Sequence, residues 1–418
     1  MKWSFGGHVT VLFVVTLGCF SLVADSTAQQ RVRARDLGIW FDGEPGPFNA
    51  ITDVDGVRVG HTTLIDGDGD LVVGEGPIRT GVTVIFPRGD ASDPVFAGWF
   101  ALNGNGEMTG TTWVKESGFL EGPIGITNTH SVGVVRDAII GWQAQTGALF
   151  QPWSLPVVAE TYDGFLNDIN GFHVRPAHVF AALDGATSGP VAEGGVGGGT
   201  GMICYGFKGG IGTASRRLAD NAGGYTVGVL VQANFGGRAL LRIDGVPVGR
   251  ELVAYGRDAA LDAPLNASLN APLSAPQAGG SGASGPFPFD PFAGDGSIII
   301  VVATDAPLLS HQLERLARRA SLGVARTGGI SSNGSGDIFV AFSTANAGAA
   351  AGRGPATLQM VRNSQITPLF NATVQATEEA IINALVAAQT MVGRDGNQIV
   401  ALPHDRVREL LRTYNRLQ

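Results

Sequence analysis

The sequence predicts a globular protein of the α+β class, on the basis of its composition and of the two kinds of pattern that divide the chain. Of 418 residues, 44% are hydrophobic and 15% are charged, below the typical ~25%, so we expect a large core and exclude intrinsic disorder. Short β-type runs bounded by Gly, Asn or Asp dominate from Arg33 to about Ala260. Strands and two long helical patterns follow in the last third.

The first 28 residues have the layout of a cleaved secretory signal peptide. Lys2 precedes an apolar stretch from Val9 to Val23, and small residues close the segment. The stretch is shorter than the ~18 apolar residues of a membrane anchor, so residues 1–28 are interpreted as the signal and the mature chain as starting near Gln29. Cys204 is then the one cysteine left, which excludes an internal disulfide. We expect a periplasmic or secreted protein.

Charge and metal-ligand patterns exclude several classes of partner. The formal net charge is -8 and no Lys/Arg-rich run is present, which argues against nucleic-acid binding. No segment after the signal is expected to enter a membrane. The histidines lack H-E-x-x-H spacing, which argues against a zinc site. We therefore expect no metal or cofactor, a small-molecule or peptide partner, and hydrogen-bonded structural roles for His130, His173 and His178, while His61 is uninformative.

In the first part of the chain, strands are expected at residues 82–86, 124–126 and 227–231, which are short β-type runs bounded by Gly, Asn or Asp. Helices are expected at residues 175–183 and 213–218, from their alanine content. The glycine run at 194–201 has no Walker A Lys, and its G-x-G-x-x-G frame breaks at Thr200. This run is interpreted as a tight structural loop.

The composition changes abruptly at residues 263–296, where Pro, Gly, Ala, Ser and Asn dominate. This segment predicts a flexible linker or exposed loop. The β-branched run at 297–304 then predicts a strand buried on both faces. A helix capped by Asp305 and ended by Gly323, a strand at 338–342, and a helix from 378 to 392, capped by Thr377 and stopped by Gly393, are expected to complete the chain.

The junction Gly296-Ser297 stands where the loop meets the buried strand. A hydroxyl there could attack the Gly296 carbonyl in an N-to-O shift, and hydrolysis of the ester would leave Ser297 as a new N-terminus. A terminal amine with a pKa of ~7.7–8 could then accept a proton from a hydroxyl, which is the chemistry of N-terminal nucleophile hydrolases. The same pair could simply open a strand. No serine lies in a G-x-S-x-G elbow, which argues against an α/β-hydrolase.

Several segments, in the same order, resemble the L-aminopeptidase/D-esterase and β-peptidyl aminopeptidase family. They are residues 51–61 (ITDVDGVRVGH), 127–133 (TNTHSVG), 160–164 (ETYDG), 296–308 (GSIIIVVATDAPL) and 335–337 (SGD). The similarity runs from about Asp36 to Ala401. It implies a self-processing serine aminopeptidase with a four-layer αββα sandwich, similar to N-terminal nucleophile hydrolases but with different strand connectivity.

The resemblance also implies how the chain is divided. Cleavage between Gly296 and Ser297 would give an α chain of residues 29–296 and a β chain of residues 297–418, both parts of a single catalytic domain. Family members usually assemble as tetramers of such heterodimers, so a homo-oligomer is expected here. The segment between Asn234 and Ser297 is longer than the family requires.

Carried over residue by residue, the resemblance implies that Ser297 is the nucleophile, that Ser335 relays its proton and that Asp337 polarises Ser335. β-Peptidyl members tend to have glutamate at the last position. Aspartate resembles the L-aminopeptidase/D-esterase branch, which leaves the substrate preference open. Without the resemblance, residues 335–337 also read as a polar turn before the next strand.

Three further residues match substrate-facing positions of the family. Asn234 would donate a side-chain N–H to the tetrahedral oxyanion, a contribution of ~2.7–4 kcal/mol in the transition state. Glu160 would pair with the free ammonium of the substrate. Tyr162 would line the pocket or hydrogen-bond the reacting group. The alternatives are an Asn-Phe-Gly turn at 234–236 and ordinary strand-edge polarity at 160–162.

The expected function is therefore hydrolysis of the N-terminal residue from short peptides, amides or esters with a free amine, through an acyl-enzyme on Ser297. One alternative is an acyltransferase resembling ornithine acetyltransferase, although that family uses threonine and works inside cells. The other is an uncleaved secreted binding protein with a Gly-rich pocket.

Overall fold

Two β-sheets form the centre of the fold. The computed structural model describes residues 1–2, 32–89, 92–256 and 296–417, and one compact unit starts at Val32. Nearly all of the expected signal peptide, and the expected loop 263–296 except for its last residue, lie outside the described residues. The larger sheet has the order β4-β3-β12-β11-β10-β9, and the smaller has the order β1-β2-β5-β6.

The strands of the larger sheet are β3 (Val95–Gly104), β4 (Phe119–Leu120), β9 (Gly210–Arg217), β10 (Thr226–Asn234), β11 (Ser297–Thr304) and β12 (Gly336–Ser343). Those of the smaller sheet are β1 (Arg58–Asp66), β2 (Ile78–Phe86), β5 (Ile124–Asn128) and β6 (Val157–Thr161). Two short hairpins pair β7 (Ile203–Cys204) with β8 (Phe207–Lys208) and β13 (Met391–Val392) with β14 (Gln398–Ile399).

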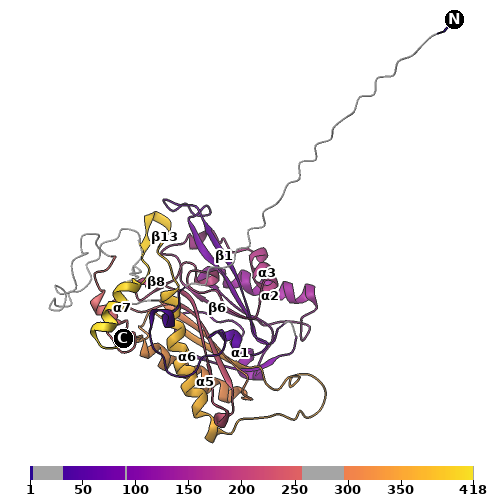
Figure 1. Ribbon diagram of the computed structural model, residues 1–418. Helices are drawn as coiled ribbons and strands as arrows, with labels where there is room; N and C mark the ends of the chain where they lie inside the picture. Colours follow the sequence, from indigo (N-terminus) through magenta and orange to yellow (C-terminus); the bar gives the residue numbers. More distant parts are fainter. Residues whose placement is uncertain (3–31, 90–91, 257–295, 418) are drawn as a thin grey trace. The chain divides into compact units, whose positions relative to one another are not determined.

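The α-helices are α1 (Thr111–Ser117), α2 (Val132–Thr146), α3 (Pro176–Asp184), α4 (Val248–Glu251), α5 (Ser310–Arg326), α6 (Thr367–Val386) and α7 (His404–Thr413). The helices α5 and α6 pack side by side on the larger sheet, and α2 and α3 pack on the smaller one (Figure 1). No helix in the described part of the chain has the length and apolarity needed to cross a bilayer.

Three hydrophobic layers separate the elements and confirm the expected four-layer αββα sandwich. One layer lies between α5/α6 and the larger sheet, one between the two sheets, and one between the smaller sheet and α2/α3. Because both faces of the larger sheet are covered, its central strands must be apolar on both sides.

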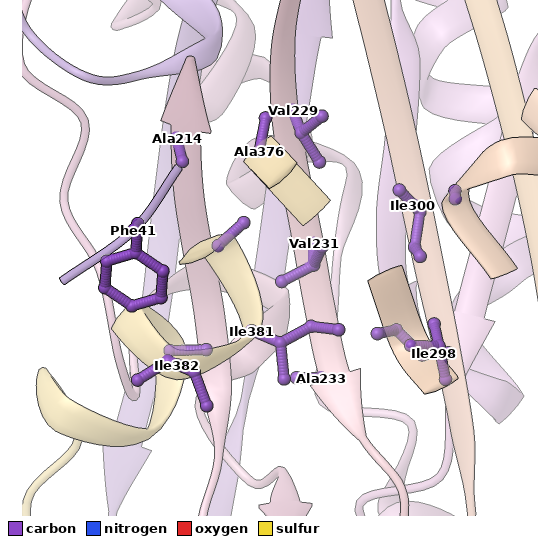
Figure 2. Packing of buried hydrophobic residues seen from close by; sticks show 14 of the residues in the cluster. Phe41, Ala214, Val229, Val231, Ala233, Ile298, Ile300, Ala376, Ile381 and Ile382 are labelled. Atoms are coloured by element: carbon purple, nitrogen blue, oxygen red, sulfur yellow. The ribbon is translucent and has the colours of Figure 1, made fainter. Parts of the chain in front are cut away.

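Strand β11 shows this requirement most clearly, since all eight of its residues are buried. Its even-numbered apolar side chains face the helices (Ile298, Ile300 and Val302), and its odd-numbered ones face the smaller sheet (Ile299, Val301 and Ala303). Figure 2 shows the helix side, where Ile298 and Ile300 lie in the same layer as Val231 and Ile381. The predicted strand at 297–304 is confirmed, as are those at 82–86, 124–126, 227–231 and 338–342.

The helix predicted at 213–218 is wrong, whereas the one at 175–183 is confirmed as α3. Residues 213–217 belong to β9, which pairs along its length with β10. Their backbone groups are satisfied by the sheet, and Gly212 lets the strand lie directly beneath α6. Tertiary contact thus overrides the helical preference of the short Ala-containing segment.

The boundaries predicted for the two long helices are also wrong. Asp305 caps no helix, because its Oδ1 accepts a hydrogen bond from the Thr226 N–H (2.8 Å) and α5 begins only at Ser310. Gly323 lies inside α5, where a Cβ would come within 2.5 Å of the Thr377 Cβ of α6. Its bare backbone therefore allows close helix packing rather than ending the helix.

Helix α6 begins at Thr367, eleven residues before the predicted start. Pro368 suits its first turn, a signal that the alanine-rich pattern further on obscured. Thr377 is interior, and its hydroxyl donates to the Thr373 carbonyl (2.7 Å). The chain leaves the helix at Val386, and residues 391–392 form β13, so Gly393 is not the stop.

Two glycines with different surroundings, Gly212 between β9 and α6 and Gly141 in α2, predict opposite effects of a Gly→Ala substitution. A Cβ on Gly212 would lie 2.0 Å from the Ala380 carbonyl oxygen, so Gly212→Ala should lower the free energy of unfolding by ~1–3 kcal/mol. In α2, a Cβ on Gly141 would meet only Phe180 at an ordinary 3.8 Å, so Gly141→Ala should raise stability by ~0.5–1 kcal/mol. Urea midpoints measure both, and equal midpoints would contradict this packing.

Candidate active site

Ser297 is the first residue of β11, and the strand order places it between two other candidate residues. In the antiparallel pair β10–β11, Ser297 lies opposite Asn234, the last residue of β10. In the parallel pair β11–β12, it lies opposite Gly336, between Ser335 and Asp337. Main-chain pairing therefore gathers segments that are far apart in the sequence at one end of the larger sheet.

Ser297 is buried, at 7% exposure of the residue, and its hydroxyl is held by a backbone donor. Its Oγ accepts a hydrogen bond from the Gly336 N–H (3.1 Å). Ser335 Oγ instead donates to Asp337 Oδ1 (2.5 Å), and no hydrogen bond between the described residues joins it to Ser297 Oγ. Burial raises the pKa of Asp337, and the hydrogen bond from Ser335 opposes that rise. The expected polarisation of Ser335 thus has matching geometry, while its relay to Ser297 stays a prediction.

Two glycines flank this centre because other backbones approach them closely. Gly296 has a φ of +144°, and a Cβ there would lie 2.1 Å from the Asn234 carbonyl oxygen. A Cβ on Gly336 would lie 2.4 Å from the Asn105 carbonyl oxygen. Any side chain at either position would push apart the segments that meet at Ser297.

The side-chain amide of Asn234 is fixed in orientation at both of its ends. Oδ1 accepts a hydrogen bond from the Ile203 N–H (2.7 Å), and Nδ2 donates to the Tyr162 carbonyl (2.9 Å). An amide nitrogen carries two hydrogens, so the contacts among the described residues leave a second N–H on Asn234, the residue that the register sets opposite Ser297. This arrangement fits a preorganised oxyanion donor.

The backbone of Tyr162 has a role in the site beside the one expected for its side chain. Its carbonyl, just beyond β6, positions Asn234, while its hydroxyl lies 2.5 Å from where a Cβ on Gly164 would stand. Burial raises the pKa of this phenol. That the ring lines the substrate pocket stays a prediction.

Glu160 lies near the end of β6 and is 3% exposed. Its Oε1 accepts from the Glu107 N–H (3.0 Å) and its Oε2 from the Thr129 hydroxyl (2.5 Å). Burial raises the pKa of Glu160, and these two hydrogen bonds counteract part of the rise. Both donors are neutral, so the carboxylate keeps lone pairs and charge for a cation.

Glu160 is also close to the Ser297 centre. A Cβ on Gly106 would lie 3.2 Å from Glu160 Oε1 and also 3.2 Å from Gly336 Cα. Glu160 Oε1 and Gly336 Cα are therefore at most about twice that distance apart. The small residue at 106 leaves the space between them open. An ammonium group on Glu160 could thus belong to a molecule that also reaches Ser297.

Asp163 is a site-supporting residue to which sequence reasoning assigned no role, although it stands in the segment 160–164. It is 1% exposed, and its Oδ1 accepts from Asn167 Nδ2 (3.1 Å). Burial raises its pKa from 3.8 to about 7, against the hydrogen bonds from Thr80, Asn167 and Asn128. Its own peptide bond carries the Tyr162 carbonyl that positions Asn234. A polar residue after a strand gave no sign of this network.

The predicted structural roles of the histidines are only partly confirmed. His173 pairs with Asp168 (2.8 Å), and His178 Nδ1 accepts from the Arg175 N–H (3.1 Å). The His130 ring has no hydrogen bond among the described residues and stacks on Phe172 at 5.9 Å. Within those same residues, no group of His, Cys, Asp or Glu could hold a metal ion.

A hollow beside Phe86, Arg88 and Trp142 lies at the opposite end of the smaller sheet from Glu160. Ile85, next to Phe86, pairs with Ile124 at the start of β5, while Thr127 near its end pairs with Glu160. This hollow therefore does not belong to the Ser297 centre.

A serine at the head of an internal strand of an αββα sandwich, beside a fixed amide and a buried carboxylate, defines a hydrolase resembling the N-terminal nucleophile type. The chain belongs to peptidase family S58, whose model matches residues 49–399.

Characterised relatives cover nearly the whole chain. "Beta-peptidyl aminopeptidase BapA" of Sphingosinicella microcystinivorans is 53% identical over 95% of this chain and 96% of its own. The solved Burkholderia sp. beta-aminopeptidase is 49% identical, covers 91% of this chain and 99% of its own, and has a TM-score of 0.77. L-aminopeptidase D-ala-esterase/amidase from Ochrobactrum anthropi, "a prototype for the serine aminopeptidases" with a variant Ntn hydrolase fold, is 46% identical, covers 92% and 99%, and has a TM-score of 0.77.

These similarities confirm the resemblance found in the sequence and the expected class of enzyme. The chain is a serine aminopeptidase with peptide substrates, rather than an acyltransferase or a binding protein.

The buried carboxyl of Asp163 predicts a pH-dependent effect on stability. Because its folded pKa of about 7 exceeds the ordinary value, it stabilises the fold at low pH, and this contribution is lost as the pH rises from about 4 to 7. Asp163→Asn should match wild type near pH 4 and be more stable by roughly 3–5 kcal/mol at pH 8. Urea unfolding at both pH values measures this, with the exposed Asp137→Asn as the control. A difference independent of pH would contradict it.

Proposed function

We propose that the chain is an exported, self-cleaving aminopeptidase that removes N-terminal β-amino residues from short peptides, with Ser297 as the nucleophile. One observation carries the proposal: Ser297 is the first residue of a buried strand, and its hydroxyl accepts a hydrogen bond from the Gly336 N–H. The residue before it, Gly296, lies in close contact with the Asn234 backbone. A bond cut at this point frees an amine without removing any residue from the sheet.

In the self-cleavage step, Ser297 Oγ attacks the Gly296 carbonyl carbon. The C–N bond breaks, the hydroxyl proton passes to the departing nitrogen, and an ester links Gly296 to Oγ. Water then hydrolyses the ester, which leaves a carboxylate on Gly296 and a free amine and hydroxyl on Ser297. The α chain, residues 29–296, and the β chain, residues 297–418, remain joined through β10 and β11.

In turnover, the substrate ammonium binds Glu160 and Ser297 Oγ attacks the carbonyl of the first residue. The free N–H of Asn234 donates to the oxyanion, and the leaving amine takes the proton that the hydroxyl gave up. Water then releases the acyl group from Ser297. The Ser297 amine and the Ser335–Asp337 pair exchange protons in both steps. The proposal requires no metal or cofactor.

The preference for β-amino residues rests on the relatives. Two of them, 53% and 48% identical, are named beta-peptidyl aminopeptidases. A β-residue places one more methylene between amine and carbonyl, so its substrates must span a longer path from Glu160 to Ser297. Asp337, where β-peptidyl members tend to have glutamate, is the feature that speaks for L-residues instead.

The cellular setting and assembly are parts of the same proposal. Residues 1–28 direct export to the periplasm or beyond, and a tetramer of αβ heterodimers is the proposed assembly. Both follow from the sequence pattern and the family resemblance.

Self-cleavage is tested by removing the Ser297 hydroxyl. Ser297→Ala should remain one chain and lose activity, because no Oγ is left to attack Gly296 or the substrate. Denaturing gels and intact mass measure the outcome, with Ser321→Ala at a half-buried position of α5 as the processed control. Finding Ser297→Ala cut between Gly296 and residue 297 would contradict the mechanism.

Substrate recognition is tested with p-nitroanilides of L, D and β residues, with free and blocked amines. We expect β residues with free amines to react fastest and blocked compounds to be inert. Thr129→Val removes a hydrogen bond that lowers the Glu160 pKa, so the acid limb of kcat/KM should move to higher pH, with about a tenfold loss at the acid edge.

Thr129→Ser keeps the hydroxyl and should restore the wild-type pH profile. Hydrolysis of blocked substrates as fast as free ones would remove Glu160 from its proposed role. A faster reaction of L residues than of β residues would overturn the substrate preference alone.

A further inference from the structure

A hollow of roughly 300 Å³, counted with the open space at its mouth, lies beside Ser335. One wall comes from the segment after β10, with Phe235 and Leu240. The other comes from the segment before β12, with Ile330 and Ser335. Because β10 and β12 are the two neighbours of β11, these segments flank the point where Ser297 begins its strand.

The hollow is open to solvent, and three apolar side chains line it together with glycines and with Ser331, Ser332 and Ser335. Ile330 is 70% exposed and Leu240 is 37% exposed, whereas Phe235 is 4% exposed. Three apolar side chains around one opening, next to a catalytic centre, are typical of a site for an apolar group.

The hollow is preformed, because hydrogen bonds to backbone carbonyls hold both of its walls in place. The Tyr205 N–H donates to the Phe235 carbonyl (2.7 Å), and Asn103 Nδ2 donates to the Ser332 carbonyl (2.5 Å). A Cβ on Gly328 would lie 1.9 Å from the Leu240 carbonyl oxygen, so the two segments are in direct contact. A ligand would not have to order either wall.

Side-chain alternation separates the hollow from the amine-binding carboxylate. Leu230, Gln232 and Asn234 are alternate residues of β10 and point toward the smaller sheet. Gln232 Nε2 donates there to the Thr127 carbonyl and to the Thr161 hydroxyl. Ser297 shares that face with Ile299. Phe235 belongs instead to the apolar layer on the helix side of the larger sheet. A substrate on Ser297 thus has Glu160 on one side and the hollow on the other.

We infer that this hollow is the subsite for the leaving half of the substrate, and that it takes an apolar side chain of the residue after the scissile bond. The inference rests on the proposed function and adds to it a preference for the second residue. With the ammonium on Glu160, the first residue occupies the side toward the smaller sheet. The leaving nitrogen then faces Ser335, at the rim of the hollow.

The experiment uses the full-length enzyme and dipeptides with one fixed N-terminal β-residue, followed by Gly, Leu or Asp. Wild type should prefer Leu over Gly in kcat/KM. Ile330→Ala and Leu240→Ala should each reduce this preference by about tenfold, because each removes methylenes from the apolar wall. Leu322→Ala, also exposed but on α5, is the matched control and should leave the preference unchanged.

A second series keeps p-nitroaniline as the leaving group and varies the first residue. The inference requires that the Ile330 and Leu240 variants leave the ranking of this series unchanged. A change in this ranking alone would assign the hollow to the first residue and overturn the inference, as would an equal loss on Gly and Leu dipeptides. Failure of wild type to hydrolyse either series would overturn the proposed function itself.

Discussion

The pairing of β11 with β10 on one side and β12 on the other is the constraint on which the rest of the site depends. It sets Ser297 opposite both Asn234 and Gly336, and hence places a hydroxyl, an amide and a backbone N–H at one sheet end. A slip of one residue would exchange the side chains on the two faces of a strand, and in β11 it would also carry Ser297 out of register with Asn234 and Gly336. The apolar run of β11 therefore positions the nucleophile as well as stabilising the core.

Polar groups around the centre are held by neutral donors and acceptors. Glu160 is fixed by the Thr129 hydroxyl and the Glu107 N–H, and Asn234 by two backbone groups. Burial raises the pKa of Glu160, and no Lys or Arg of the described residues forms an ion pair with it, so an ammonium group is the partner that would stabilise its charge. Binding of a free amine and alignment of its carbonyl with Ser297 thus become one event.

The sequence predicted the strands and the candidate residues better than the limits of the helices. Strands such as 297–304 are long, β-branched and buried on both faces, so local pattern and tertiary environment agree. The helix misplaced at 213–218 and the helix end misplaced at Gly323 arose where Gly212 and Gly323 permit close packing, which depends on residues far away in the chain. Gly323 was taken as a helix end. The late start given to α6 arose because the alanine-rich pattern further on obscured Pro368.

The residues that support the site were harder to predict from the sequence than the candidate site residues themselves. Ser297, Ser335, Asp337, Asn234 and Glu160 were all identified by resemblance, and the structure gathers them near one sheet end. The roles of Thr129, Gly106 and Asp163 depend on contacts between β5, β6 and distant loops, which no local spacing reveals. Tyr162 acts on Asn234 through its carbonyl, a contact that side-chain identity does not encode.

The most direct measurement is denaturing mass spectrometry of wild-type enzyme quenched during hydrolysis of a slow ester substrate. The account predicts a transient acyl group on a fragment that begins at residue 297, located on Ser297 itself by peptide mapping. An acyl group on any other residue, or on an unbroken chain, would contradict it.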